Sequence, residues 1–184
     1  MKSNEKVSSK EVGLEVGLVI SRFLYKTEHL HYGYWPDDLE IIPENVRKAQ
    51  DLHSKLIIDS IPDDVETILD IGSGSGGLAE KLIEKGFNVH CVSPSDYLAD
   101  AIEEKLGDKV KVFRSTCQDL ELEQKYDLVI FSESFQYVQV NQAIEKSIDA
   151  LKPNKHLLIC DFFRQPGTGR RPLGGGHEIG RAHV

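Results

Sequence analysis

The sequence has few cysteines, one tryptophan and no long hydrophobic run. Its three cysteines, Cys91, Cys117 and Cys160, lie in separate segments without C-x-x-C spacing, which argues against a disulfide framework or a zinc site. No segment reaches the roughly 18 apolar residues that a membrane-spanning helix needs, and the first residues, MKSNEKVSSKEVG, lack the layout of a signal peptide. We therefore expect a cytoplasmic protein with no membrane partner and no bound metal.

Positive charge is also scarce, because 22 Lys and Arg stand against 30 Asp and Glu, for a formal net charge of -8. Affinity for nucleic acid comes largely from clustered Lys and Arg, so this balance disfavours a nucleic-acid partner. With 184 residues, of which 40% are hydrophobic, the chain has room for one domain with a buried core. A small molecule is the expected partner, and the oligomeric state is left open.

The order of predicted elements indicates an α/β fold. From Val65 onward, short β-branched runs alternate with longer segments of helical periodicity, as in a doubly wound, mostly parallel sheet. The expected strands are 65–71, 87–93, 109–115, 127–132 and 156–162. The expected helices are 76–85, 96–106, opened by Ser95 and stopped by Gly107, and about 141–151, which ends before Pro153.

An N-terminal helical region, residues 1–62, is predicted in front of a core over residues 63–177. Its helices are expected over 11–25 and 44–60, and the segment between them reads EHLHYGYWPDD. Solvated linkers do not gather Tyr32, Tyr34 and Trp35 in this way. These rings either fix the N-terminal helices on the sheet or belong to a lid over a ligand.

The glycine-rich segment LDIGSGSGG, residues 69–77, fits two ligand-binding patterns. Gly72, Gly74 and Gly76 match the G-x-G-x-G turn of a methyl-donor site, whereas Gly72, Gly74 and Gly77 match the G-x-G-x-x-G of a dinucleotide site. Glycine has no Cβ, so either turn lets backbone N–H groups approach a ligand closely. The loop alone leaves both ligands open.

Residues near the loop favour the methyl donor. A dinucleotide site expects an Asp or Glu at the end of the second strand for the ribose hydroxyls, and Ser93 stands there instead. Asp70 completes the pattern D-x-G-x-G-x-G, and a carboxylate suits an ammonium-bearing cofactor better than a pyrophosphate. An NAD(P)-binding oxidoreductase domain is the less favoured alternative.

Segments in register along the chain resemble the successive motifs of the class I S-adenosylmethionine-dependent methyltransferases, in their small-molecule type. They are ILDIGSGSGGLAEKL, VSPSDYLADAIEEKL, STCQDLELEQKYDLVIFSESFQYV and ALKPNKHLLICDFF, and HLHYGYW is similar to the family's N-terminal lid segment. The resemblance implies a Rossmann-like sheet of order 3-2-1-4-5 and S-adenosylmethionine as cofactor. It also implies in-line methyl transfer to N, O or C of a small acceptor. A module that binds the methyl donor without turnover is the main alternative.

The resemblance further implies a cofactor site at the carboxyl ends of the strands. Its expected residues are Asp70, Gly72, Ser73, Gly74, Gly76, Ser93, Ser95, Thr116, Cys117, Gln118, Ser132 and Tyr32. Ser93 and Thr116 stand where the family often has acidic residues for the ribose and the adenine, so weaker binding is expected.

No spacing singles out a catalytic base. The candidates are His29, His31, Glu133 and His177, because a hydroxyl or ammonium acceptor must lose a proton.

The end of the chain, RQPGTGRRPLGGGHEIGRAHV, shows no strand or helix pattern. Residues 178–184 back-translate to a sequence that resembles a common sequencing adapter, so we expect a non-native tail there. The final strand pair of the family is then expected to be missing, which would leave the fifth strand as an exposed edge and the fragment with little activity.

Overall fold

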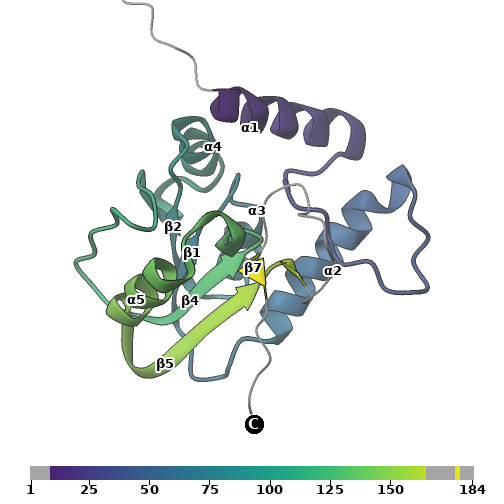
Figure 1. Ribbon diagram of the computed structural model, residues 1–184. Coiled ribbons are helices and arrows are strands. Elements are labelled where there is room, and N and C mark those ends of the chain that lie inside the picture. Colours follow the sequence, from purple (N-terminus) through teal and green to yellow (C-terminus); the bar gives the residue numbers. More distant parts are fainter. Residues whose placement is uncertain (1–8, 165–176, 179–184) are drawn as a thin grey trace, which may run out of the picture.

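The computed structural model describes residues 9–164 and 177–178 (Figure 1). Its centre is a five-stranded sheet in the order β3-β2-β1-β4-β5, with every neighbouring pair parallel. The strands are β1 Thr67–Ile71, β2 Asn88–Val92, β3 Lys111–Phe113, β4 Tyr126–Ser132 and β5 Leu151–Cys160. The predicted order 3-2-1-4-5 is confirmed. A short parallel pair, β6 Phe163–Arg164 and β7 His177–Glu178, lies beside it.

Helices pack on both faces of the sheet, because its buried strands are apolar on both sides. The helices are α1 Ser9–Ile20, η1 Ser21–Tyr25, η2 Pro43–Asn45, α2 Val46–Asp59, α3 Gly77–Glu84, α4 Asp96–Leu106, η3 Gly107–Lys109, η4 Phe135–Tyr137 and α5 Val140–Ala150. Ile68 and Ile130 share one core cluster with α2, α3 and α4, whereas their neighbours Leu69 and Phe131 pack with α5 on the other face. None of the helices within residues 9–164 is long and apolar enough to cross a bilayer.

Strand β5 begins earlier than predicted, which corrects the expected loop around Pro153. Leu151 follows α5 directly and pairs with Tyr126, and the register shifts before the pairing continues. Proline is tolerated at an edge strand or an irregularity, and β5 is the edge of the described sheet. Asn154, with φ 58°, adopts the left-handed backbone that this irregularity requires.

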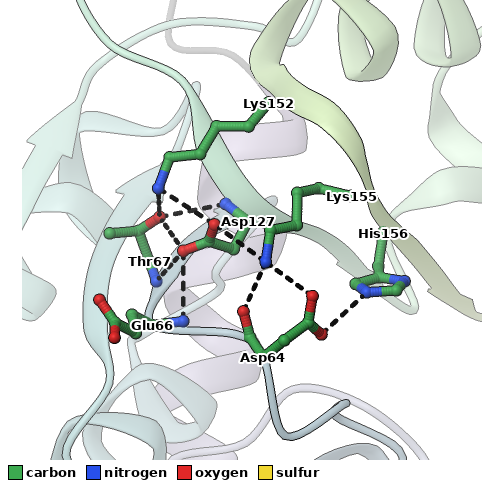
Figure 2. Close-up of polar contacts among 7 residues, drawn as sticks. All are labelled: Asp64, Glu66, Thr67, Asp127, Lys152, Lys155 and His156. Atoms are coloured by element: carbon green, nitrogen blue, oxygen red, sulfur yellow. Dashed lines mark hydrogen bonds and ion pairs between the residues drawn. The ribbon is translucent and has the colours of Figure 1, made fainter.

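A polar cluster fixes the amino ends of β1, β4 and β5 (Figure 2). The Asp127 carboxylate accepts hydrogen bonds from the backbone N–H and the hydroxyl of Thr67, and Lys152 Nζ lies 3.0 Å from its other oxygen. Burial alone would raise the pKa of Asp127, but these bonds hold it well below its usual range. Lys155 bridges Asp127 to Asp64 in the same cluster. This cluster lies at the edge of the sheet opposite the carboxyl ends of the strands, where the cavity described below is found.

The N-terminal segment packs on the core rather than extending from it. Leu18 of α1 forms a small apolar cluster with Leu98 and Ala101 of α4, and Figure 1 shows α1 lying across α4. The segment after η1 is tied to α2, because Gln50 Nε2 donates to the carbonyl oxygen of His31 at 2.6 Å. The division into residues 1–62 and 63–177 stays a prediction, and residues 179–184 of the expected tail lie outside the described part of the chain.

Candidate functional site

A cavity of about 620 Å³ lies at the carboxyl ends of β1, β2 and β4. Its walls come from the glycine loop, the strand ends, residues 115–118 and residues 28–32 of the N-terminal segment. Parallel α/β sheets bind ligands at this edge, because the connections after the strands diverge there. The structure therefore brings segments that are distant in sequence around one space.

The glycine loop forms the cavity wall after β1. Gly72, Gly74 and Gly76 all have positive φ, at 78°, 57° and 80°, which favours glycine at each position. Gly72 and Gly74 line the cavity, whereas Gly76 does not and instead faces Ile102 of α4. Gly77 lines the cavity, and a Cβ on it would lie 2.7 Å from the His29 ring. The loop is thus shaped both by its turns and by close packing against neighbouring segments.

Asp70 is buried at the bottom of this wall without a partner. Neither carboxylate oxygen has a hydrogen bond among the described residues, since the Ser73 hydroxyl donates to the Asp70 carbonyl oxygen at 2.7 Å. Burial raises the pKa of Asp70 to about 7. A buried carboxylate without donors is costly and rare in proteins. The site therefore suits a ligand that brings N–H donors or positive charge to Asp70.

Hydroxyl groups at the β2 end of the cavity already have partners in the protein. Ser93 Oγ donates to the Ser95 carbonyl oxygen at 3.2 Å, and Ser95 Oγ accepts from the Leu98 N–H as the predicted cap of α4. Ser95 Oγ also donates to the Glu11 carboxylate of α1, at 2.5 Å. Sequence reasoning missed Glu11, since no local pattern indicates a contact between residues so far apart in the chain.

The segment after β3 lines the same end of the cavity with Thr116, Cys117 and Gln118. Thr116 Oγ1 donates to Asp119 Oδ2 at 2.7 Å, and Cys117 is buried. Ser132 and Tyr32 line the cavity as well, with Tyr32 65% exposed. The structure thus places the sequence-predicted residues around one cavity, except Gly76.

A second buried group lies where β4 ends. Glu133 Oε1 lies 3.6 Å from His53 Nε2 and 3.9 Å from His31 Nδ1, and the two imidazole rings are 4.4 Å apart. Glu133 has φ 51°, an uncommon backbone conformation for a residue other than glycine. Burial raises the pKa of Glu133 to about 7, lowers that of His31 to about 2 and also lowers that of His53. At neutral pH both imidazoles are therefore uncharged.

His53 was not predicted from the sequence, although a signal for it exists. It lies on the buried face of α2 together with Gln50 and Ser54, so that polar side chains interrupt an otherwise apolar helical face. Among the other base candidates, His29 lines the cavity and burial lowers its pKa to about 4. The backbone of His177 pairs with Phe163 in β7, and the His177 side chain lies outside the described part of the structure.

The family model and curated relatives that match the chain are described as methyltransferases. A family model described as a methyltransferase domain matches residues 68–154. The ubiquinone biosynthesis O-methyltransferase of Rickettsia felis is 30% identical over 153 residues, which cover 77% of this chain and 61% of that protein. The chain spans about three fifths of the length of the curated relatives it matches.

Solved structures agree in fold. The [4+2]-cyclase SpnF aligns with a TM-score of 0.73 and 20% identity, covering 93% of this chain and 67% of that one. Geranyl diphosphate methyltransferase, solved with GPP and sinefungin, aligns with a TM-score of 0.71 and 16% identity, covering 90% and 70%. At these identities the likeness establishes the fold, and the names of the two proteins show that the fold hosts more than one reaction.

Proposed function

We propose that the chain, whose residues 68–154 match a methyltransferase-domain family model, is a class I S-adenosylmethionine-dependent methyltransferase that transfers a methyl group to a small-molecule acceptor. The observation that carries the proposal is the unpaired Asp70 carboxylate beside a positive-φ glycine loop in the cavity. An α-ammonium group would supply the donors and the positive charge that Asp70 lacks.

The residues around the cavity fit the rest of this cofactor. Gly74 leaves room for the methionine part to approach the backbone, because nothing lies within 4 Å of a Cβ added there, and Ser93 faces the same cavity from the end of β2. Cys117 and Gln118 can contact the adenine through backbone and amide groups. When bound, the cofactor supplies an activated methyl group on a sulfonium. The protein then has to align the acceptor in line with that group and exclude water.

The acceptor end is assigned to the part of the cavity between Tyr32 and Glu133. Both line the cavity, and the Tyr32 N–H lies 3.5 Å from Glu133 Oε2. A carboxyl group with its pKa raised to about 7 is suited to take a proton from a hydroxyl acceptor near neutral pH. The O-methyltransferase name of the Rickettsia felis relative supports an oxygen acceptor. We assign Glu133 as the base, with His31 as its neighbour.

The setting proposed for this reaction is the cytoplasm, in agreement with the absence of a spanning helix from residues 9–164. The net charge of -8 supports a small acceptor over nucleic acid.

Calorimetric titration of the chain with S-adenosylmethionine, its demethylated product and NAD tests the cofactor. Binding of the first two alone is expected, with Asp70→Asn weakening it and the matched surface variant Asp108→Asn leaving it unchanged. Binding of NAD, or equal affinities in the two variants, would contradict the proposal.

Because the SpnF fold carries a cyclase, methyl transfer itself is tested by formation of the demethylated product with phenolic and catecholic acceptors. Tight binding without turnover of any acceptor would favour a non-catalytic binding module.

A further inference from the structure

The group formed by His31, His53 and Glu133 has features that cofactor binding does not explain. Its three residues come from separate elements, namely the N-terminal segment, α2 and the end of β4. Each offers one possible ligand atom, and these atoms lie within 4.8 Å of one another. The side chains of His53 and Glu133 are only 6% and 8% exposed. Converging donors of this kind, away from bulk water, form the framework of a metal site.

The charge balance of the group is incomplete. Glu133 has no Lys or Arg within ion-pair distance among the described residues; one carboxylate oxygen faces the two imidazoles, and the other lies 3.5 Å from the Tyr32 N–H. Imidazole nitrogens are common ligands of transition-metal ions. A cation at the centre would compensate the buried carboxylate and would replace the hydrogen bonds that His31 Nδ1 accepts from the Gly33 N–H and that His53 Nε2 makes with Cys160 Sγ.

Cys160 lies beside His53 and is the candidate for a fourth donor. Cys160 Sγ lies 3.3 Å from His53 Nε2, and the backbone couples the two strand ends, since the Glu133 N–H donates to the Cys160 carbonyl oxygen at 2.8 Å. Ligands at about 2.1 Å from a tetrahedral ion lie about 3.4 Å apart. Three of the pairwise separations, 3.3, 3.6 and 3.9 Å, are close to that value, whereas the ligand atoms of His31, His53 and Glu133 lie as much as 4.8 Å apart, so side-chain movements have to draw the donors together around an ion.

We propose that His31, His53 and Glu133 bind a divalent transition-metal ion, with Cys160 as the fourth ligand. Two nitrogens, one carboxylate oxygen and one sulfur suit Zn²⁺ and Co²⁺ and disfavour Mg²⁺ and Ca²⁺, which prefer all-oxygen sites. Gln50 positions the site, because its amide donates to the carbonyl oxygen of His31 and so holds this residue against α2. Glu133 is the proposed base in the metal-free protein and becomes a ligand when the ion binds, so metal binding is tested separately from methyl transfer. The bound ion would also polarise an acceptor oxygen in the neighbouring cavity, and this role rests on the proposed function.

Titration with Co²⁺ in an anaerobic buffer tests the site by its spectrum. The chain is prepared without an affinity tag and treated with a chelator, because tags contribute histidines. The expected result is one equivalent of tetrahedral Co²⁺, displaced by Zn²⁺ and not by Mg²⁺. His53→Ala and Glu133→Gln should each weaken binding by at least about tenfold. Cys160→Ser should keep the visible bands and abolish the thiolate charge-transfer band. His156→Ala, a surface histidine beside Asp64, should bind as the parent does.

Thermal melts and S-adenosylmethionine titrations of the same samples keep the outcomes distinct. A folded parent that binds no stoichiometric Co²⁺ overturns the metal site, as does binding that His31→Ala, His53→Ala and Glu133→Gln all leave unchanged. If the charge-transfer band persists in Cys160→Ser, Cys160 is not a ligand. A protein that binds the cofactor but not Co²⁺ contradicts only the metal site. A protein that binds Co²⁺ but not the cofactor contradicts only the methyltransferase proposal.

Discussion

The Cβ atom that Gly72 lacks would lie 2.4 Å from the Cβ of Ser134, so the glycine loop and the turn after β4 are in direct contact. Ser134 strengthens this contact, because its hydroxyl donates to the Ile71 carbonyl oxygen at 2.5 Å. The loop that faces the proposed cofactor and the segment that follows Glu133 are therefore held against each other. A change in one is expected to displace the other.

Gly72→Ala tests this contact. A methyl group at φ 78° is strained and overlaps Ser134, so we expect a loss of about 2 to 4 kcal/mol in the free energy of unfolding, measured by urea denaturation. Affinity for the cofactor should fall as well. Gly86→Ala is the matched control, because φ is 95° there but no atom lies within 4 Å of the added Cβ. Gly86→Ala should lower the free energy of unfolding by about 1 kcal/mol and leave the affinity for the cofactor unchanged. Equal effects of the two substitutions would show that the contact is unimportant.

Asp70 makes cofactor affinity depend on pH. Its pKa of about 7 lies above the value in an unfolded chain, so the ligand-free protein binds an extra proton between about pH 4 and 7. The ligand-free protein should therefore become more stable as the pH falls from 7 toward 4. A cationic ligand prefers the ionised carboxylate, so affinity should rise with pH up to about 7 and then level off.

Calorimetry from pH 5.5 to 8.5 checks this dependence, and Asp70→Asn should flatten the profile of affinity against pH. Thermal melts without ligand over the same range test the stability change. A parent affinity that is constant with pH would show that no positive group of the ligand contacts Asp70.

Glu133→Gln separates turnover from cofactor binding. The amide keeps the shape of the side chain but cannot accept a proton, so turnover should fall by about 100-fold or more. Affinity for S-adenosylmethionine should stay within about threefold of the parent, because the substitution leaves Asp70 and the glycine loop intact. Product formation and calorimetry measure the two quantities. Full turnover in this variant would remove Glu133 from the proposed reaction.

Asp127→Ala tests the polar cluster in Figure 2. It leaves the backbone N–H of Thr67 and that of Glu66 without acceptors, so the free energy of unfolding should fall by about 2 to 4 kcal/mol. The pKa of Asp127 is lowered in the folded state, so its contribution is present above about pH 4 and is lost as the pH falls further. Urea denaturation at pH 7 and pH 3 measures both effects. Asp64→Ala, at an exposed position in the same cluster, should change the midpoint much less.

Much of the fold could be predicted from local pattern. Short β-branched runs alternate with segments of 3.6-residue periodicity, and Ser95 caps α4 as its position predicts. The predicted start of β5 was wrong. Pro153 indicates a break in secondary structure, but it is tolerated beside the irregularity in an edge strand.

The site was predictable where its residues are consecutive and missed where they are not. Asp70 and the glycines form one motif, whereas His53 and Glu11 reach the site from helices that lie far from this motif in the sequence. Gly76 and Gly77 show the limit of motif matching. Both are needed by close packing, but only Gly77 lines the cavity.

Helix α2 has a consequence for making shorter versions of the protein. Ile57 is 1% exposed and belongs to the same core cluster as Ile68 and Leu82, and the same buried face of this helix carries Gln50 and His53. A minimal domain cut after residue 62 would lose a layer of its core together with one wall of its cavity. We expect such a fragment to expose apolar surface and to aggregate, so that any smaller catalytic unit has to keep α2.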